Sequence, residues 1–176
     1  ITGRKKTMWW EWAQRAAADL FIPLLVVQLV HYWGGDEQEL AQMLEVKTNP
    51  GMTTSLTLSD GTVVFLNSES RLTYPSHFNG DTRNVTLQGE AYFEVTQDSL
   101  RPFLVEFEGA CVKVLGTQFN VRAYPTGPSF TTLVSGCVKI VHKNQVLQLE
   151  PGQQCEVREE KMLLHNADLM LSLIHI

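Results

Sequence analysis

The sequence lacks the motifs that most catalytic and metal-binding sites require. It contains neither a GxSxG nucleophile motif nor a phosphate-binding loop of the GxxxxGK(S/T) or GxGxxG form. His77 and His142 have no second histidine or cysteine at a metal-ligand spacing, so we expect ordinary surface or loop histidines. The chain therefore offers no basis for nucleophilic, nucleotide or metal chemistry. We expect no enzymatic activity, no cofactor and no metal.

Basic residues and cysteines are also scarce. The 14 Lys and Arg residues are outnumbered by 19 Asp and Glu residues, which gives a net charge of −5. A nucleic-acid-binding protein needs clustered basic side chains, so we exclude direct contact with DNA or RNA. Cys111, Cys137 and Cys155 show neither a CxxC nor a zinc-site spacing. We expect all three cysteines to be packing residues. If the domain faces an oxidising compartment, one disulfide between two of them is the alternative.

One long hydrophobic run is present, at residues 16–33, with the sequence AAADLFIPLLVVQLVHYW. As a helix it would extend about 27 Å, close to the thickness of a bilayer core. No basic residue follows the run before Lys47, whereas four precede it: Arg4, Lys5, Lys6 and Arg15. The positive-inside rule then predicts a cytoplasmic juxtamembrane segment at 1–15, a transmembrane helix at 16–33, and the remainder outside the cytoplasm. A buried or surface-lying amphipathic helix is the alternative.

The chain after this run changes to the two-residue period of β-strands. Residues 34–47 are polar and predict a linker, and residues 48–158 predict one domain of short strands separated by turn residues. Asp60-Gly61 predicts a hairpin between strands, and Pro151-Gly152 predicts a second. Gly116 and Gly136 interrupt strand-like runs and indicate bulges or tight bends.

These features predict an all-β fold, an antiparallel jelly-roll-like or solenoid-like β sandwich preceded by one transmembrane α-helix. Residues 159–176 are expected to be a truncated tail, and the final letters LSLIHI look like a translated sequencing adapter.

The segment EAYFEV, residues 90–95, shows the strand pattern most clearly. Phe93 lies on its apolar side, and Phe119 occupies the same kind of position in QFNV, so we expect both in the core. Glu90 and Glu94 share the opposite side and could form an acid–base pair for glycoside cleavage. Because that side should face solvent, we expect ordinary solvated carboxylates instead.

Several motifs together resemble the FecR family of transmembrane sigma-factor regulators, in the forms found in Bacteroidetes. They are LSDGTVVFLNSESRLTYP, VTLQGEAYFEV, PFLVEFEGACVKVLGTQFNVRAY, TTLVSGCVKI and LQLEPGQQCEV, between about Asn49 and Val157. GEAYFEV followed by VLGTQFNV is the most specific pair. The resemblance marks these residues as structural members of the family motifs: Gly61, Gly89, Phe93, Gly116, Thr117, Phe119, Gly136 and Gly152.

The resemblance implies an anti-sigma factor in the bacterial inner membrane, with a cytoplasmic N-terminus and a periplasmic β domain. Its implied partners are an extracytoplasmic-function sigma factor, bound by a segment expected before Ile1, and the signalling domain of an outer-membrane TonB-dependent transporter, bound by a subdomain expected after about Glu159. The alternative is a membrane-anchored glycan-binding or glycan-cleaving jelly roll. It would need a platform of Tyr74, Tyr92 and Tyr124 or a cleft with paired carboxylates.

Overall fold

The computed structural model describes residues 21–29, 41–159 and 161–167, in two units that divide between residues 39 and 40. In the first unit, residues 21–29 are helical and their side chains are exposed. The other residues of the predicted span, 16–20 and 30–33, lie outside the described part. Within that part, no helix combines the length and the apolar character that crossing a membrane requires.

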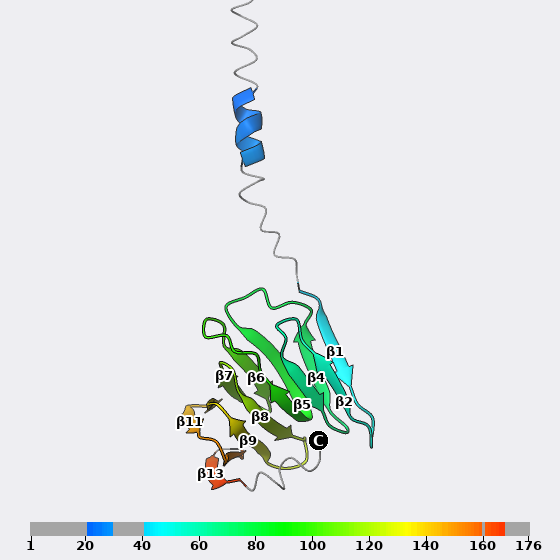
Figure 1. Ribbon diagram of the computed structural model, residues 1–176, viewed down its shortest axis with the longest axis vertical. Coiled ribbons are helices and arrows are strands. Elements are labelled where there is room, and N and C mark those ends of the chain that lie inside the picture. The colour runs from blue at the N-terminus through cyan, green and yellow to red at the C-terminus, as the bar shows by residue number, and fades with distance from the viewer. Residues whose placement is uncertain (1–20, 30–40, 160, 168–176) are drawn as a thin grey trace, which may run out of the picture. The chain divides into compact units, whose positions relative to one another are not determined.

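The second unit consists of β-strands, which confirms the predicted all-β class (Figure 1). The strands are β1 (Met43–Lys47), β2 (Thr54–Thr57), β3 (Val63–Leu66), β4 (Arg71–Pro75), β5 (Arg83–Glu94), β6 (Phe103–Phe107), β7 (Ala110–Val114), β8 (Gln118–Ala123), β9 (Ser129–Ser135), β10 (Val138–His142), β11 (Gln145–Leu149), β12 (Gln153–Val157) and β13 (Met162–Asn166).

The strands form two sheets that share β5. Sheet A has the order β1-β4-β5-β6-β7-β10-β11, and sheet B has the order β2-β3-β5-β8-β9-β12-β13. Every pairing is antiparallel except β5 with β6. The chain leaves the end of β5 and returns through residues 95–102 to the start of that strand, so β6 runs beside it in the same direction. The antiparallel prediction is thus right for all pairs but this one.

Strand β5 changes sheets at Gly89. Its first half, Arg83–Gln88, pairs with β4 and β6 in sheet A, and Gly89–Glu94 pairs with β3 and β8 in sheet B. Gly89 has a φ of +101°, a conformation that L side chains rarely adopt. A Cβ atom at this position would also lie 2.4 Å from the hydroxyl oxygen of Ser70 and 2.7 Å from its Cα atom. Both the backbone and the available space therefore require glycine here.

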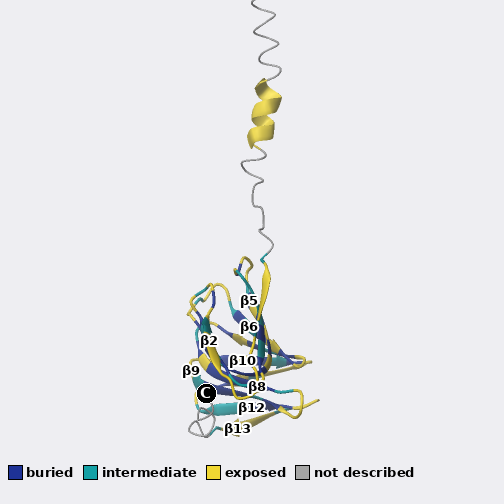
Figure 2. Cartoon of the chain, turned by 90° about the vertical axis from the view of Figure 1, so that its right-hand side faces the viewer, coloured by how far each residue is buried: buried dark blue, intermediate teal, exposed yellow. Residues whose placement is uncertain are grey.

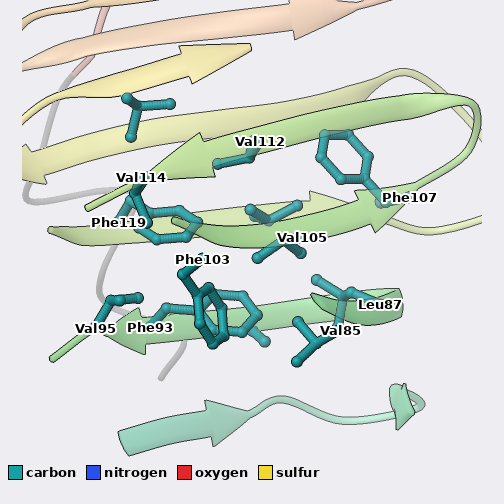
Figure 3. Close-up of a cluster of buried hydrophobic side chains, with 14 of the residues drawn as sticks. Val85, Leu87, Phe93, Val95, Phe103, Val105, Phe107, Val112, Val114 and Phe119 are labelled. Carbon is teal, nitrogen blue, oxygen red and sulfur yellow. The ribbon is translucent and has the colours of Figure 1, made fainter. Parts of the chain in front are cut away.

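The hydrophobic core lies between the sheets and follows the alternation of the strands (Figure 2). Phe93 and Phe119 are fully buried and stack with ring centroids 5.1 Å apart, and Phe103 packs 6.1 Å from Phe93 (Figure 3). The prediction that Phe93 and Phe119 are core residues is confirmed. Val85 and Leu87 before the bend of β5 face the same core. The period of two thus continues through Gly89, and one strand contributes core side chains from both sheets.

The turn predictions have different outcomes. Asp60-Gly61 joins β2 and β3 as an antiparallel hairpin, with Thr57 opposite Val63, as predicted. Pro151-Gly152 also forms a turn, in which the Gln153 amide donates to the Glu150 carbonyl oxygen at 3.0 Å. That turn carries the chain from β11 in sheet A to β12 in sheet B, so the predicted hairpin is wrong. The sequence signal describes the local backbone of a turn and does not specify which strands pair.

The β domain extends beyond the predicted range of 48–158 at both ends. The range 34–47 was expected to be a linker, but β1 (Met43–Lys47) pairs with β4 over its whole length. The range 159–176 was expected to be a tail, but β13 (Met162–Asn166) pairs with β12. Both are edge strands whose residues are mostly exposed. Their weak apolar alternation explains why the sequence did not indicate them.

A buried ion pair connects the two sheets beside β5. Arg83 at the start of β5 donates from Nη1 to Oδ2 of Asp60 at 2.7 Å, with only 1% and 6% of the side chains exposed. The guanidinium also donates to the carbonyl oxygens of Thr96 at 3.0 Å and Arg101 at 2.9 Å. It lies 5.5 Å from the centre of the Phe103 ring. Arg83 therefore fixes the β2–β3 turn and the 95–102 connection at one point.

Gly89→Ala should destabilise the domain more than the same change at another glycine with positive φ. Gly51 provides the control, because its φ is +74° and a Cβ atom added there would have no other atom within 4 Å. Gly51→Ala should lose about 1–2 kcal/mol of unfolding free energy from backbone strain alone. Gly89→Ala adds the clash with Ser70 and should lose at least about 1 kcal/mol more. Urea unfolding of both variants measures the difference, and equal losses would contradict the close contact.

Asp60→Asn should leave Arg83 as a buried charge without its counter-ion. Loss of one partner of a buried pair typically costs about 3–5 kcal/mol of unfolding free energy. The matched control is Glu45→Gln, which removes the exposed pair of Glu45 with Arg71 at 3.2 Å and should cost at most about 1 kcal/mol. In the double variant Asp60→Asn with Arg83→Met, part of the loss should return. Chemical denaturation measures these losses. Similar losses of unfolding free energy for Asp60→Asn and Glu45→Gln would refute the stabilising role of the buried pair.

Candidate functional site

All family-motif glycines except Gly61 lie where the chain passes between the sheets. Gly116 and Thr117 connect β7 in sheet A to β8 in sheet B, and Gly136 connects β9 in sheet B to β10 in sheet A. They are tight bends, as predicted. Gly61 and Gly152 lie in turns and have φ values of +83° and +84°.

These connections pack against one another, and we call residues 95–98, 115–117 and 135–137 the crossover stack. The Val95 amide donates to the Thr117 carbonyl oxygen at 3.0 Å, and the Thr117 hydroxyl donates to the Cys137 carbonyl oxygen at 3.0 Å. A Cβ atom on Gly116 would lie 2.7 Å from the Cα atom of Gln97. The VLGTQFNV motif is therefore explained by close backbone packing rather than by chemistry.

The acidic pair of β5 does not lie as predicted. Glu90 is on the outer face of sheet B but is only 8% exposed, so its expected solvation is wrong. The side-chain amide of Asn67 donates to Glu90 Oε2 at 3.0 Å, and that of Asn120 donates to Oε1 at 2.9 Å. Glu94 is partly exposed and pairs in register with Gln118. Because amide donors occupy both oxygens of Glu90, the arrangement is that of a buried structural carboxylate.

The three tyrosines of the possible glycan platform are not brought together. Tyr74 packs against the core, and Tyr124 donates its hydroxyl to the Ser68 carbonyl oxygen at 2.9 Å. Tyr92 lies on the outer face of sheet B, with its ring 6.1 Å from that of Phe65. Burial, followed by the charge of Glu94, raises the pKa of Tyr92 above its usual value. The tyrosines thus have separate local roles.

The two histidines singled out from the sequence also differ. His77 is exposed, as expected, whereas His142 on β10 is 5% exposed and so is not a surface residue. Its Nδ1 atom lies 3.1 Å from the Gly109 carbonyl oxygen, and its Nε2 atom lies 3.4 Å from that of Glu159. His142 therefore joins the β6–β7 turn to the β12–β13 turn. In the described ranges, no three His, Cys, Asp or Glu side chains form a group that could hold a metal.

The cysteines are free thiols in three different environments. Cys155 lies in the core, Cys111 is partly exposed on sheet A, and Cys137 is exposed in the crossover stack. Burial, followed by the charge of Glu156, raises the pKa of Cys155 to about 11, so this thiol stays protonated at neutral pH. The expected packing role fits Cys155 best.

The β domain has clefts in two regions. One cleft, of about 1330 Å³, lies among the turns at one end, where the Ser129 hydroxyl donates to Glu108. Another, of about 750 Å³, lies on the outer face of sheet A. Its lining residues are Arg71, Thr73, Thr86, Leu87, Gln88, Glu106, Phe107, Glu108, Gly109, Ala110, Cys111, Pro125, Val141 and Lys143.

The sheet A cleft has charged side chains of both signs in its lining. Burial and the neighbouring carboxylate of Glu106 raise the pKa of the Cys111 thiol, and the nearby Lys113 ammonium partly opposes this. No sequence motif marks Lys113 or Glu106, so neither is among the predicted site residues. Their proximity depends on strand register, which a single sequence does not reveal.

Comparison with known proteins gives consistent results. The family described as "FecR protein" matches residues 45–139. Two crystal structures from Parabacteroides distasonis ATCC 8503, each described as a "putative anti-sigma factor", are 37% and 38% identical, with TM-scores of 0.70 and 0.69. The alignments cover 72% and 71% of this chain but 61% and 60% of those chains. No curated protein matches significantly.

The matched residues 45–139 include the β2–β3 turn, the bend of β5 and the whole crossover stack. They also include both motifs, GEAYFEV and VLGTQFNV, that carried the resemblance in the sequence. The chain belongs to the FecR family.

Proposed function

We propose that this chain is the sensor part of a membrane-anchored anti-sigma factor. It would relay a signal from an outer-membrane TonB-dependent transporter, across the inner membrane, to an extracytoplasmic-function sigma factor. The observation that carries the proposal is the family match over residues 45–139, together with the anti-sigma description of two structures about 37% identical to this chain. The basic residues before the apolar run at 16–33 support a cytoplasmic N-terminus.

The domain would act through contacts with partner proteins. A partner that binds one of two domain conformations more tightly shifts the population toward that conformation. Because β5 contributes to both sheets, a partner that distorts one sheet also acts on the other through the bend at Gly89. The shift would reach the cytoplasmic segment through the chain that precedes β1.

A catalytic role on glycans has less support. Both oxygens of Glu90 accept hydrogen bonds from asparagine side chains, and Tyr74, Tyr92 and Tyr124 lie in separate environments. An acid–base pair would require a carboxylate that can exchange a proton with substrate. We therefore place the function in regulation.

The proposed topology predicts opposite outcomes for two reporter fusions. Alkaline phosphatase, which is active only outside the cytoplasm, should be active when fused after Lys47 and inactive when fused after Arg15. A cytoplasmic β-galactosidase reporter at the same positions should give the reverse result. Phosphatase activity at both positions, or at neither, would contradict a single membrane crossing between them.

The regulatory role predicts a transcriptional phenotype for the natural gene. Deletion should change expression of the neighbouring transporter gene or its response to the transported ligand, as measured by quantitative RNA analysis. Complementation with Gly89→Ala, which disturbs the β domain, should not restore the response, whereas Gly51→Ala should. Unchanged expression in the deletion strain, with an intact neighbouring sigma factor, would refute the proposal.

A further inference from the structure

Two lysines face each other on the outer surface of sheet A. Lys113 on β7 is the direct register partner of Lys139 on β10, and both are exposed. Their neighbours along this row are the uncharged Leu104 on β6 and Gln148 on β11. Like charges directly opposite each other on neighbouring strands repel and destabilise the pair. Within the described residues, neither lysine has an ion-pair partner.

Two acidic groups lie near this pair, but neither forms an ion pair with it in the described residues. Glu106, on the same face, pairs in register with Cys111, which is two residues along β7 from Lys113, so Glu106 is the diagonal neighbour of that lysine. Glu108 accepts the hydroxyl hydrogen of Ser129. The protein as a whole is acidic, with a net charge of −5, so a locally cationic surface contrasts with the rest of the molecule.

The sheet A cleft continues from the lysine pair along β7 and β10. Cys111 and Val141 are register partners that line it, and Lys143 lines it from the turn after β10, where its φ is +50°. Lys139, Val141 and Lys143 are spaced two residues apart. The surface thus presents the positive charge of the lysine pair, a small half-buried apolar step with the Glu106 carboxylate beside it, and the positive charge of Lys143. At about 3.3 Å per strand residue, the two charged positions are about 13 Å apart.

We propose that this surface binds an extended acidic segment of a partner protein. Two carboxylates four residues apart would reach Lys113 with Lys139 at one end and Lys143 at the other. A small apolar side chain midway would lie over Val141 and Cys111. In an extended strand, residues i, i+2 and i+4 project from one side, which matches this spacing. These charges and their spacing are independent of whether the protein controls a sigma factor.

Fluorescence anisotropy with a labelled peptide, GETVTEG, and the full 176-residue chain tests the proposal at low salt. The peptide places glutamates at i and i+4 with valine between them, and GQTVTQG is the neutral control. We expect saturable, salt-sensitive binding of the acidic peptide only. Lys113→Glu and Lys139→Glu should each weaken it about tenfold, since each replaces an attraction with a repulsion. Arg122→Glu, a charge reversal at an exposed position on β8 of sheet B, should leave binding unchanged.

Thermal melting separates loss of binding from loss of folding. Either single reversal creates an opposite-charge cross-strand pair, so both variants should melt at or above the wild-type temperature. A lower melting temperature in both would contradict the repulsion on which the inference depends. Equal binding of the neutral peptide, equal weakening by Arg122→Glu, or displacement of the peptide by millimolar inorganic phosphate would each overturn the proposed acidic segment.

Discussion

Strand β5 forms part of both sheets, and the conformation of Gly89 is what allows it to do so. With φ at +101° and the backbone of Ser70 too close to admit any Cβ atom, the strand turns without breaking its alternation. Val85 and Leu87 on one side of the bend therefore face the same core as Phe93 on the other. The continuous backbone of β5 therefore links the two sheets inside the domain. The other strands of each sheet pair in sequence outward from β5.

The sheet crossings at Gly116 and Gly136 depend on the same kind of close approach. At Gly116 the backbone lies against Gln97, and at Gly136 a Cβ atom would lie 2.9 Å from the Thr117 hydroxyl oxygen. Hydrogen bonds from Val95 and Thr117 then connect successive crossings. Arg83 supplies the electrostatic counterpart, since a single buried guanidinium binds the β2–β3 turn and the return connection to β6. The FecR motifs in this chain thus mainly determine how the crossings stack.

Much of this fold could be predicted from the sequence because its signals are local. Alternation identified Phe93 and Phe119 as core residues, and Asp60-Gly61 encodes a hairpin turn in its own backbone preferences. The sequence failed where the outcome depends on distant neighbours. Glu90 has the solvent-side phase of its strand, yet Asn67 from the β3–β4 connection and Asn120 from β8 enclose it. The turn at Pro151-Gly152 is correct locally, but its strands lie in different sheets.

The outer faces of the two sheets satisfy their polar groups in different ways. On sheet B, buried carboxylates have internal donors: Glu90 has two asparagine amides, and Glu156 has Arg158 and His165. On sheet A, Lys113 and Lys139 oppose each other without a counter-ion in the described domain. A group whose partners are all internal gains little from a new contact, whereas a like-charge pair is stabilised when a group of opposite charge binds beside it. The like-charge pair without an ion-pair partner lies on sheet A. A like-charge pair that costs stability is expected more often at a binding surface than elsewhere.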